Sequence, residues 1–271
     1  MEIYSMLKKT SFFVLPLVMM TNVQGGQFVL DVGYQLELGD YDSSSSTDVT
    51  RIPVQLTYFA DVWSVGVKVP YVSVRGDATV IPGVRGQASG QGQGPGSGSL
   101  AALPTTQSVT RSGLGDSQIS VSRAFFPEQP GEIFYELTAA VKLPTADEQE
   151  ALGSGETDYS IKLSISSEVG PWMPGLSVGY QFTGDTANTD FNDIGFVSVG
   201  TGYRLDKDST LSAGIDYEQA VIDGADDFSV VSMGYTRELA SQTKIGVTLK
   251  AGLTDNSLDQ GVSVFVSIPL K

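Results

Sequence analysis

From residue 26 onward, apolar and polar residues alternate along the chain in about a dozen segments. Every even-numbered residue from Phe28 to Leu38 is apolar, and so is every even-numbered residue from Val262 to Leu270. Two-residue alternation predicts strands with one apolar and one polar face. The breaks between segments are alternately short and long, which is typical of strands running up and down around a closed sheet. The pattern predicts an all-β fold, a transmembrane up-and-down antiparallel β-barrel of about 12 strands.

The predicted strands are long enough to cross the hydrocarbon of a bilayer at a tilt. An even number is typical of bacterial single-chain barrels, in which short connections lie on the periplasmic side and long ones outside. The strands are predicted at residues 27–39, 49–60, 63–75, 114–126, 132–144, 158–168, 172–184, 194–205, 209–220, 228–239, 243–253 and 261–271. The external connections are predicted at residues 40–48, 76–113, 145–157, 185–193, 221–227 and 254–260.

Aromatic residues support this assignment, because amphipathic rings gather at both boundaries of a membrane. Outward positions near the periplasmic ends are Phe28, Tyr58, Trp63, Phe125, Tyr135, Trp172, Tyr203 and Tyr235. Outward positions near the external ends are Tyr71, Tyr159, Tyr180, Phe182 and Tyr217. A secreted β-sandwich is the alternative, but its aromatic residues have no reason to form two belts.

The N-terminus has the three parts of an export signal. Lys8 and Lys9 precede an apolar stretch at residues 11–20, and small or tolerated residues follow near Gly25. The apolar stretch is about half the length of a spanning helix. We therefore expect residues 1–25 to be a signal peptide, with an uncleaved anchor as the alternative, and residues 26–271 to form one outer-membrane β-barrel domain.

Composition excludes several functions. The 271 residues include no histidine and no cysteine, so a Ser-His-Asp triad, a thiolate nucleophile and the common zinc sites have no basis. The net charge of −15 argues against nucleic acid, which needs a basic surface. The sequence thus predicts neither an enzyme nor a cofactor, and it gives no catalytic or metal-binding residues.

Residues 83–99 are rich in glycine, serine and glutamine and predict an external loop within 76–113. A phosphate-binding glycine loop is the sharper alternative, but it needs a preceding strand, a following helix and usually a lysine. The stretch Gly113 to Asp116 is interpreted as the start of a strand.

Function is expected on the inner face of the barrel, because the outer face only has to be apolar. Alternation places charges of both signs inside, which suits a water-filled path for small solutes, although paired charges could also plug a narrow barrel. The candidate pore-lining residues are Asp31, Glu37, Arg51, Lys68, Glu136, Lys142, Lys162, Arg204, Asp216, Glu218 and Lys250, with Glu168 beside them.

Three of these cations share one local setting. Arg51, Lys68 and Lys142 each precede a proline by two residues toward the external end of a strand. One hypothesis is a basic ring that favours anionic organic solutes near the mouth. The alternative is that these cations balance Glu37 and other carboxylates, since isolated charge pairs reveal little.

Most of the acidic residues fall in the predicted external loops, as in Asp147, Glu148 and Glu150. Clustered carboxylates could hold divalent cations that bridge to lipopolysaccharide. Solvated loops explain the same residues, and no segment has calcium-loop spacing.

The stretch Val141 to Thr145, followed by Leu152 to Gly155 and by Asp158-Tyr159, resembles the central signature of the outer-membrane family named for the meta-pathway of phenol degradation. Residues 69–71 and 113–116 are similar to earlier blocks of that family. The resemblance implies a passive outer-membrane route for small organic molecules, without establishing phenol as a substrate. The chain departs from such proteins at its C-terminus, which ends on Lys271 instead of an aromatic residue, and this puts insertion efficiency in doubt.

Two functions are compatible with the sequence. The first is an outer-membrane channel for passive uptake of small organic molecules, aromatic or anionic among them, with loop 76–113 available as a lid. The second is a non-conducting surface protein whose acidic loops bind partners or envelope components. The partners expected are outer-membrane lipid, lipopolysaccharide and small solutes.

Overall fold

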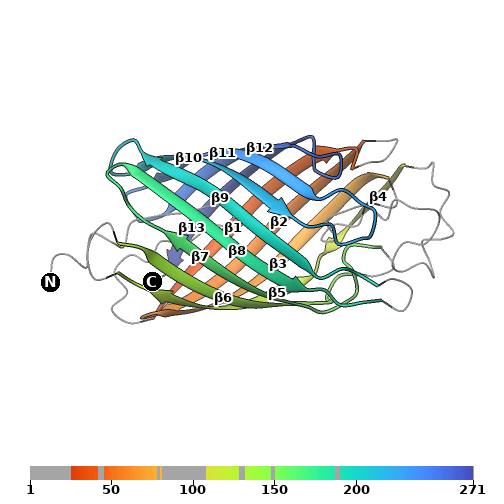
Figure 1. The fold of residues 1–271 in the computed structure, drawn as a ribbon, viewed down its shortest axis with the longest axis horizontal. Coiled ribbons are helices and arrows are strands. Elements are labelled where there is room, and N and C mark those ends of the chain that lie inside the picture. Colours follow the sequence, from red (N-terminus) through yellow and green to blue (C-terminus); the bar gives the residue numbers. More distant parts are fainter. Residues whose placement is uncertain are drawn as a thin grey trace.

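The computed structural model describes residues 26–41, 46–77, 80, 108–127, 132–147, 150–186 and 190–270. Within these residues the chain forms strands and turns, and the strands form a barrel in which they are tilted relative to its long axis (Figure 1). The strands are β1 (Gln27–Gly39), β2 (Thr47–Ala60), β3 (Trp63–Asp77), β4 (Ser108–Leu114), β5 (Ser117–Phe125), β6 (Phe134–Leu143), β7 (Asp158–Ser166), β8 (Trp172–Phe182), β9 (Ile194–Arg204), β10 (Ser209–Glu218), β11 (Phe228–Glu238), β12 (Lys244–Gly252) and β13 (Gln260–Leu270).

The sheet is antiparallel and closed. Apart from β4 and β5, each strand pairs with the next along the chain, and β1 pairs with β13 from Phe28 opposite Leu270 to Leu38 opposite Gln260. Strands β4 and β5 both pair with β3 and so occupy one position in the wall. The wall therefore has 12 strand positions, which confirms the predicted fold class. No helix in the described part of the chain is long and apolar enough to cross a membrane.

The predicted start of the strand at residues 114–126 was wrong. The predicted strand 114–126 begins at Ser108 and is interrupted at Gly115 and Asp116, so the stretch Gly113 to Asp116 is a break within a strand. The connection predicted at 76–113 is shorter at both ends, because β3 runs to Asp77. The outward residues here are polar, as in Arg75 and Thr110, and the buried Val72 and Val74 face inward. The alternation is therefore the reverse of the one used to predict the strands.

The interruption is a β-bulge. Leu114 lies opposite Tyr71, and Gln118 lies opposite Lys68, so three residues of one strand face two of the other. The Gly115 N–H donates to the Pro70 carbonyl at 2.8 Å, but Pro70 has no N–H to donate in return. The extra residue shifts the alternation by one. Odd-numbered residues therefore face inward before the bulge, and even-numbered residues face inward after it.

The exposed faces of the strands carry the predicted aromatic belts. All the aromatic residues predicted for the belts are exposed except Tyr235, which is half-buried. Rings pair across strands, with centroids 4.9 Å apart for Phe28 and Tyr58 and 4.8 Å for Trp172 and Tyr203. The Arg123 guanidinium lies 5.3 Å from the Trp63 ring, on the outer face. These contacts place amphipathic groups at one rim of the barrel, as a membrane boundary requires.

The proposed signal peptide and most of loop 76–113 lie outside the described residues.

Candidate functional site: the inner face of the barrel

The middle of one wall carries small hydroxyl side chains. These inward side chains lie at mid-height on β5 to β9 and are half-buried, so other side chains do not fill the space in front of them. Two pairs hydrogen-bond along the wall, Ser122 with Thr138 at 2.8 Å and Ser177 with Ser164 at 3.0 Å. We call this set the hydroxyl wall; its residues are Ser120, Ser122, Thr138, Ser160, Ser164, Ser177 and Ser198.

The periplasmic end of the opposite wall is filled by side chains. The inward residues there are buried, and they belong to β1, β2, β3, β12 and β13: Val29, Asp31, Thr57, Phe59, Ser64, Lys244 and Ser267. Inward residues near the periplasmic ends of other strands, such as Ala124, Met173 and Ser209, are buried as well. The lumen is therefore packed near its periplasmic end, while the hydroxyl wall at mid-height is only half-buried.

A three-residue ion-pair cluster spans the closure between the first and last strands. Arg51 on β2 pairs with Glu37 on β1, and the Lys250 Nζ on β12 lies 3.2 Å from the Glu37 Oε1. Lys250 reaches across β13 at Gly261, which is opposite both Lys250 and Glu37 and has no side chain to obstruct the contact. We call Arg51, Glu37 and Lys250 the seam cluster.

Tyr41 lies in the turn beyond the seam cluster. Burial raises the pKa of its hydroxyl, and the nearby Glu37 carboxylate raises it further. Tyr41 is therefore neutral at physiological pH, and it leaves the charge balance of the seam cluster unchanged.

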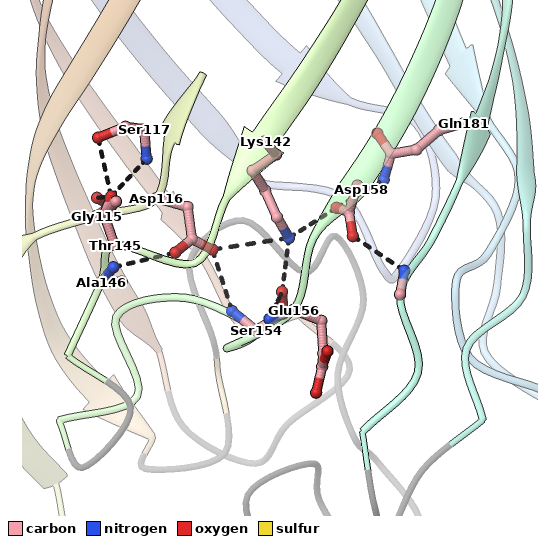
Figure 2. A network of polar contacts seen from close by, with 11 residues as sticks. Gly115, Asp116, Ser117, Lys142, Thr145, Ala146, Ser154, Glu156, Asp158 and Gln181 are labelled. Carbon is pink, nitrogen blue, oxygen red and sulfur yellow. Dashed lines mark hydrogen bonds and ion pairs between the residues drawn. The ribbon is translucent and has the colours of Figure 1, made fainter. Parts of the chain in front are cut away.

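A second cluster forms around Lys142 on β6 (Figure 2). The Lys142 Nζ lies 2.6 Å from the Asp158 Oδ2 and 3.6 Å from the Asp116 Oδ2, and it donates to the Ser154 Oγ at 2.6 Å. The Asp116 carboxylate accepts from the N–H groups of Ala146 and Ser154 at 3.1 and 3.3 Å. Two carboxylates therefore share one ammonium group, and we call Lys142, Asp116 and Asp158 the mouth cluster.

The Asp158 carboxylate extends the mouth cluster toward β8. It accepts from the Gln181 Nε2 at 3.2 Å and from the Gly184 N–H at 3.1 Å (Figure 2). Ala151 to Ser154, between β6 and β7, are buried, and Leu152 is 1% exposed. This segment packs against the inward side of Gly113, so the connection between β6 and β7 folds into the external mouth.

A further pair lies at the periplasmic end of the barrel. The Arg204 Nη2 on β9 is 3.2 Å from the Glu168 Oε1 in the turn after β7. The Glu168 and Arg204 side chains are 23% and 33% exposed, so water screens this pair more than the two clusters at the other end.

The remaining candidates are also on inward, half-buried positions. Glu136 and Lys162 are diagonal neighbours on β6 and β7, because Glu136 lies opposite Ser164 and Lys162 opposite Thr138. Asp216 on β10 accepts from the Ser198 Oγ at 2.6 Å. Lys68 and Glu218 complete the set on β3 and β10, and both have interacting partners.

The structure brings three candidates together in the seam cluster, whereas Lys142 lies with two carboxylates that were not candidates. The three cations of the proposed basic ring therefore do not form one group. Arg51 and Lys142 each lie beside carboxylates, in the seam cluster and the mouth cluster respectively. This geometry fits the charge-balancing alternative for these two cations. Among the described residues, no group of His, Cys, Asp or Glu side chains is arranged to hold a metal ion.

Sequence reasoning did not place five charged residues inside: Arg111, Asp116, Asp158, Glu238 and Lys244. Arg111 lies opposite the buried Val74, in a segment predicted as loop, and its Nη2 donates to the Val80 carbonyl at 2.6 Å. Asp116 turns inward because of the bulge. Asp158 could have been assigned by extending the alternation of Ser160 and Lys162 backward by one step.

The model of a family described as a protein of unknown function, DUF3187, matches residues 108–264. The match runs from the start of β4 through the mouth cluster and into β13, and it covers more than half of the chain. The chain belongs to the DUF3187 family. No protein of curated function matches the sequence.

Solved structures show the same fold for this DUF3187 member at low sequence identity. The COG4313 outer membrane channel from Pseudomonas putida F1 is similar with a TM-score of 0.70 and 13% identity, over 92% of this chain and 97% of that chain. The KdgM porin in complex with disordered oligogalacturonate has a TM-score of 0.53 and 11% identity, over 89% and 99% of the two chains. The NanC porin has a TM-score of 0.52 and 10% identity, over the same shares.

Proposed function

We propose that this DUF3187 protein is a passive channel of the bacterial outer membrane for small organic solutes. The observation that carries the proposal is the hydroxyl wall, whose inward side chains stay half-buried at mid-height of a closed 12-strand barrel. A barrel of this size filled by its own side chains would bury those positions. Small hydroxyl groups leave room for a solute and can hydrogen-bond it.

The similar structures support the general class of this proposal. Two of the three are named as porins and one as a channel, and KdgM holds an oligogalacturonate. The resemblance to the meta-pathway family suggests aromatic or other small organic molecules as the finer substrate class. The proposal requires no enzymatic step, and it includes export by residues 1–25 and contact with outer-membrane lipid and lipopolysaccharide.

A tryptophan placed on the hydroxyl wall tests whether this wall borders the path. Ser177 faces inward on β8, between Ser164 and Ser198 on the neighbouring strands, and Val178 beside it faces outward. Ser177→Trp should slow the swelling of protein-containing liposomes in small neutral solutes by about threefold or more, because the indole occupies the lumen. Val178→Trp is the matched control and should swell at the wild-type rate.

Both variants first have to insert as folded barrels, which a compact, heat-modifiable band on gels reports. Equal swelling rates for Ser177→Trp and the wild type would contradict a path along this wall. Absence of any swelling with the inserted wild-type protein would favour the non-conducting surface protein instead.

A further inference from the structure

The inner face carries nearly equal numbers of positive and negative charges, but the two signs are divided in space. Apart from Lys244 near the periplasmic end, the inward charged residues of β12, β1, β2, β3 and β4 are four cations and two carboxylates, which gives a formal charge of +2. They are Lys250, Arg51, Lys68, Arg111, Asp31 and Glu37. We call this set the basic half.

The other half of the wall has the opposite sign. The inward charged residues from the bulge through β10, again without those near the periplasmic end, are five carboxylates and two cations, a formal charge of −3. They are Asp116, Glu136, Asp158, Asp216, Glu218, Lys142 and Lys162. We call this set the acidic half.

Strand order places the two halves across the lumen from each other. The basic half is centred on β1 and extends over β13 to β12 on one side and over β2 to β3 and β4 on the other. The acidic half extends over β5 to β10, with its centre near β7 and β8. In a closed ring of 12 strand positions these centres are opposite.

The clusters strengthen this division at the external end. The seam cluster has two cations on one carboxylate, whereas the mouth cluster has two carboxylates on one cation. Pairing within each cluster therefore leaves a residual charge of opposite sign on the two sides. The charges near the periplasmic end do not add to the division, because Arg204 lies beside Glu168 and Lys244 lies opposite Glu238.

We propose that the lumen is a dipolar filter that favours small zwitterionic solutes, meaning molecules that carry an ammonium and a carboxylate group. Opposed charges on the low-dielectric walls of a water-filled lumen create a transverse field. A zwitterion gains energy by turning its carboxylate toward the basic half and its ammonium group toward the acidic half, while a neutral isomer of the same size gains much less. The proposal rests on the channel function proposed above and names its preferred substrates.

Alanine and lactamide are suitable probes, because they are isomers that differ mainly in being zwitterionic and neutral. In liposome swelling, the ratio of the alanine rate to the lactamide rate reports the transverse field, and the lactamide rate alone reports an open path. The test variant is Lys68→Gln with Glu218→Gln, which removes one charge from each half and leaves the net charge unchanged. Lys207→Gln with Asp208→Asn, an exposed pair in the turn between β9 and β10, is the matched control.

We expect the ratio to fall by about twofold in the Lys68 and Glu218 double variant, the size of an ion-pair interaction in a high-dielectric setting, and to stay unchanged in the control. An unchanged ratio in a double variant that still admits lactamide would overturn the filter while leaving the channel intact. If lactamide fails to enter through the inserted wild-type protein, the channel proposal itself fails.

Discussion

Lys142 shows how a single charged residue can hold several elements together. Its ammonium group contacts carboxylates that arrive from the β4 to β5 bulge and from the start of β7, together with a hydroxyl from the connection between β6 and β7. The Asp116 and Asp158 side chains are only 8% and 5% exposed, and Lys142 is the cation that lies beside both. The residue is thus structural as well as lumenal.

Replacing Lys142 by methionine should destabilise the barrel. The change leaves two buried carboxylates facing each other without a cation, which costs about 3 kcal/mol in the free energy of unfolding. Urea unfolding in lipid vesicles, followed by the fluorescence of Trp63 and Trp172, measures this cost. Lys207→Met is the control, because the Lys207 side chain is 86% exposed and should contribute almost nothing.

A second substitution separates charge imbalance from lost packing. Asp158→Asn in the Lys142→Met background removes one of the stranded carboxylates and should recover part of the lost stability. A double variant that is as unstable as Lys142→Met alone would show that packing of the lysine stem, and not its charge, is what matters.

Alternation along the strands was enough to place the eleven candidate side chains on inward positions, because each lies within a strand of regular pairing. It failed where pairing is irregular. The bulge shifts the face of every residue before it relative to those after it, so Arg111 and Asp116 could not be assigned by counting from β5. The sequence also could not predict which inward side chains contact each other, because contacts such as Lys250 with Glu37 depend on the closure of the barrel.

At the scale of elements, the connection between β6 and β7 lines the inner side of the barrel at its mouth. Its buried segment includes Leu152 to Ser154 of the motif noted in the sequence, and it packs against the irregular strand β4 to β5. The Cβ atom that a side chain at Gly153 would add lies 2.4 Å from the Asp116 carboxylate, so only glycine fits there without displacing Asp116. The motif therefore describes how a loop is fixed inside the mouth.

Leu152→Asn should release this connection from the lumen. Leu152 is buried, and its apolar contacts hold the segment in place. An asparagine would lose these contacts and bury an amide, at a cost of about 2 kcal/mol or more in the free energy of unfolding. Released residues should become sensitive to added protease in intact liposomes, and the swelling rate in neutral solutes should rise because the mouth widens. Leu143→Asn, on the outward face at the end of β6, is the comparison.

Protease resistance equal to that of the wild type would show that the connection stays in place without Leu152. A widened path without new protease sensitivity would point to a local change in the mouth instead of release of the whole segment.

At the scale of the molecule, the seam cluster joins the two ends of the sheet. Arg51, Glu37 and Lys250 belong to β2, β1 and β12, so their contacts cross the pairing of β1 with β13. Hydrogen bonds between the strands close the ring, and the cluster adds a side-chain connection over the same boundary.

Glu37→Gln should weaken this closure. It removes the shared carboxylate and leaves two cations close together, with an expected loss of about 2 kcal/mol in the free energy of unfolding. The temperature at which the folded band is lost on gels should fall. Glu168→Gln breaks the more exposed pair with Arg204, away from the seam, and should have a smaller effect. Equal effects of the two substitutions would argue against a special role for the seam.

The pairing of residues 28–38 with residues 260–270 also has a consequence for biogenesis. The first strand cannot pair with its second neighbour until the last strand has been synthesised. Until then the chain exposes two unpaired edges, and an unpaired edge is a template for aggregation. Contacts between such distant segments form slowly, because a long loop has to close first. Together with the proposed export to the outer membrane, this predicts that the protein depends on periplasmic holding chaperones until its final strand arrives.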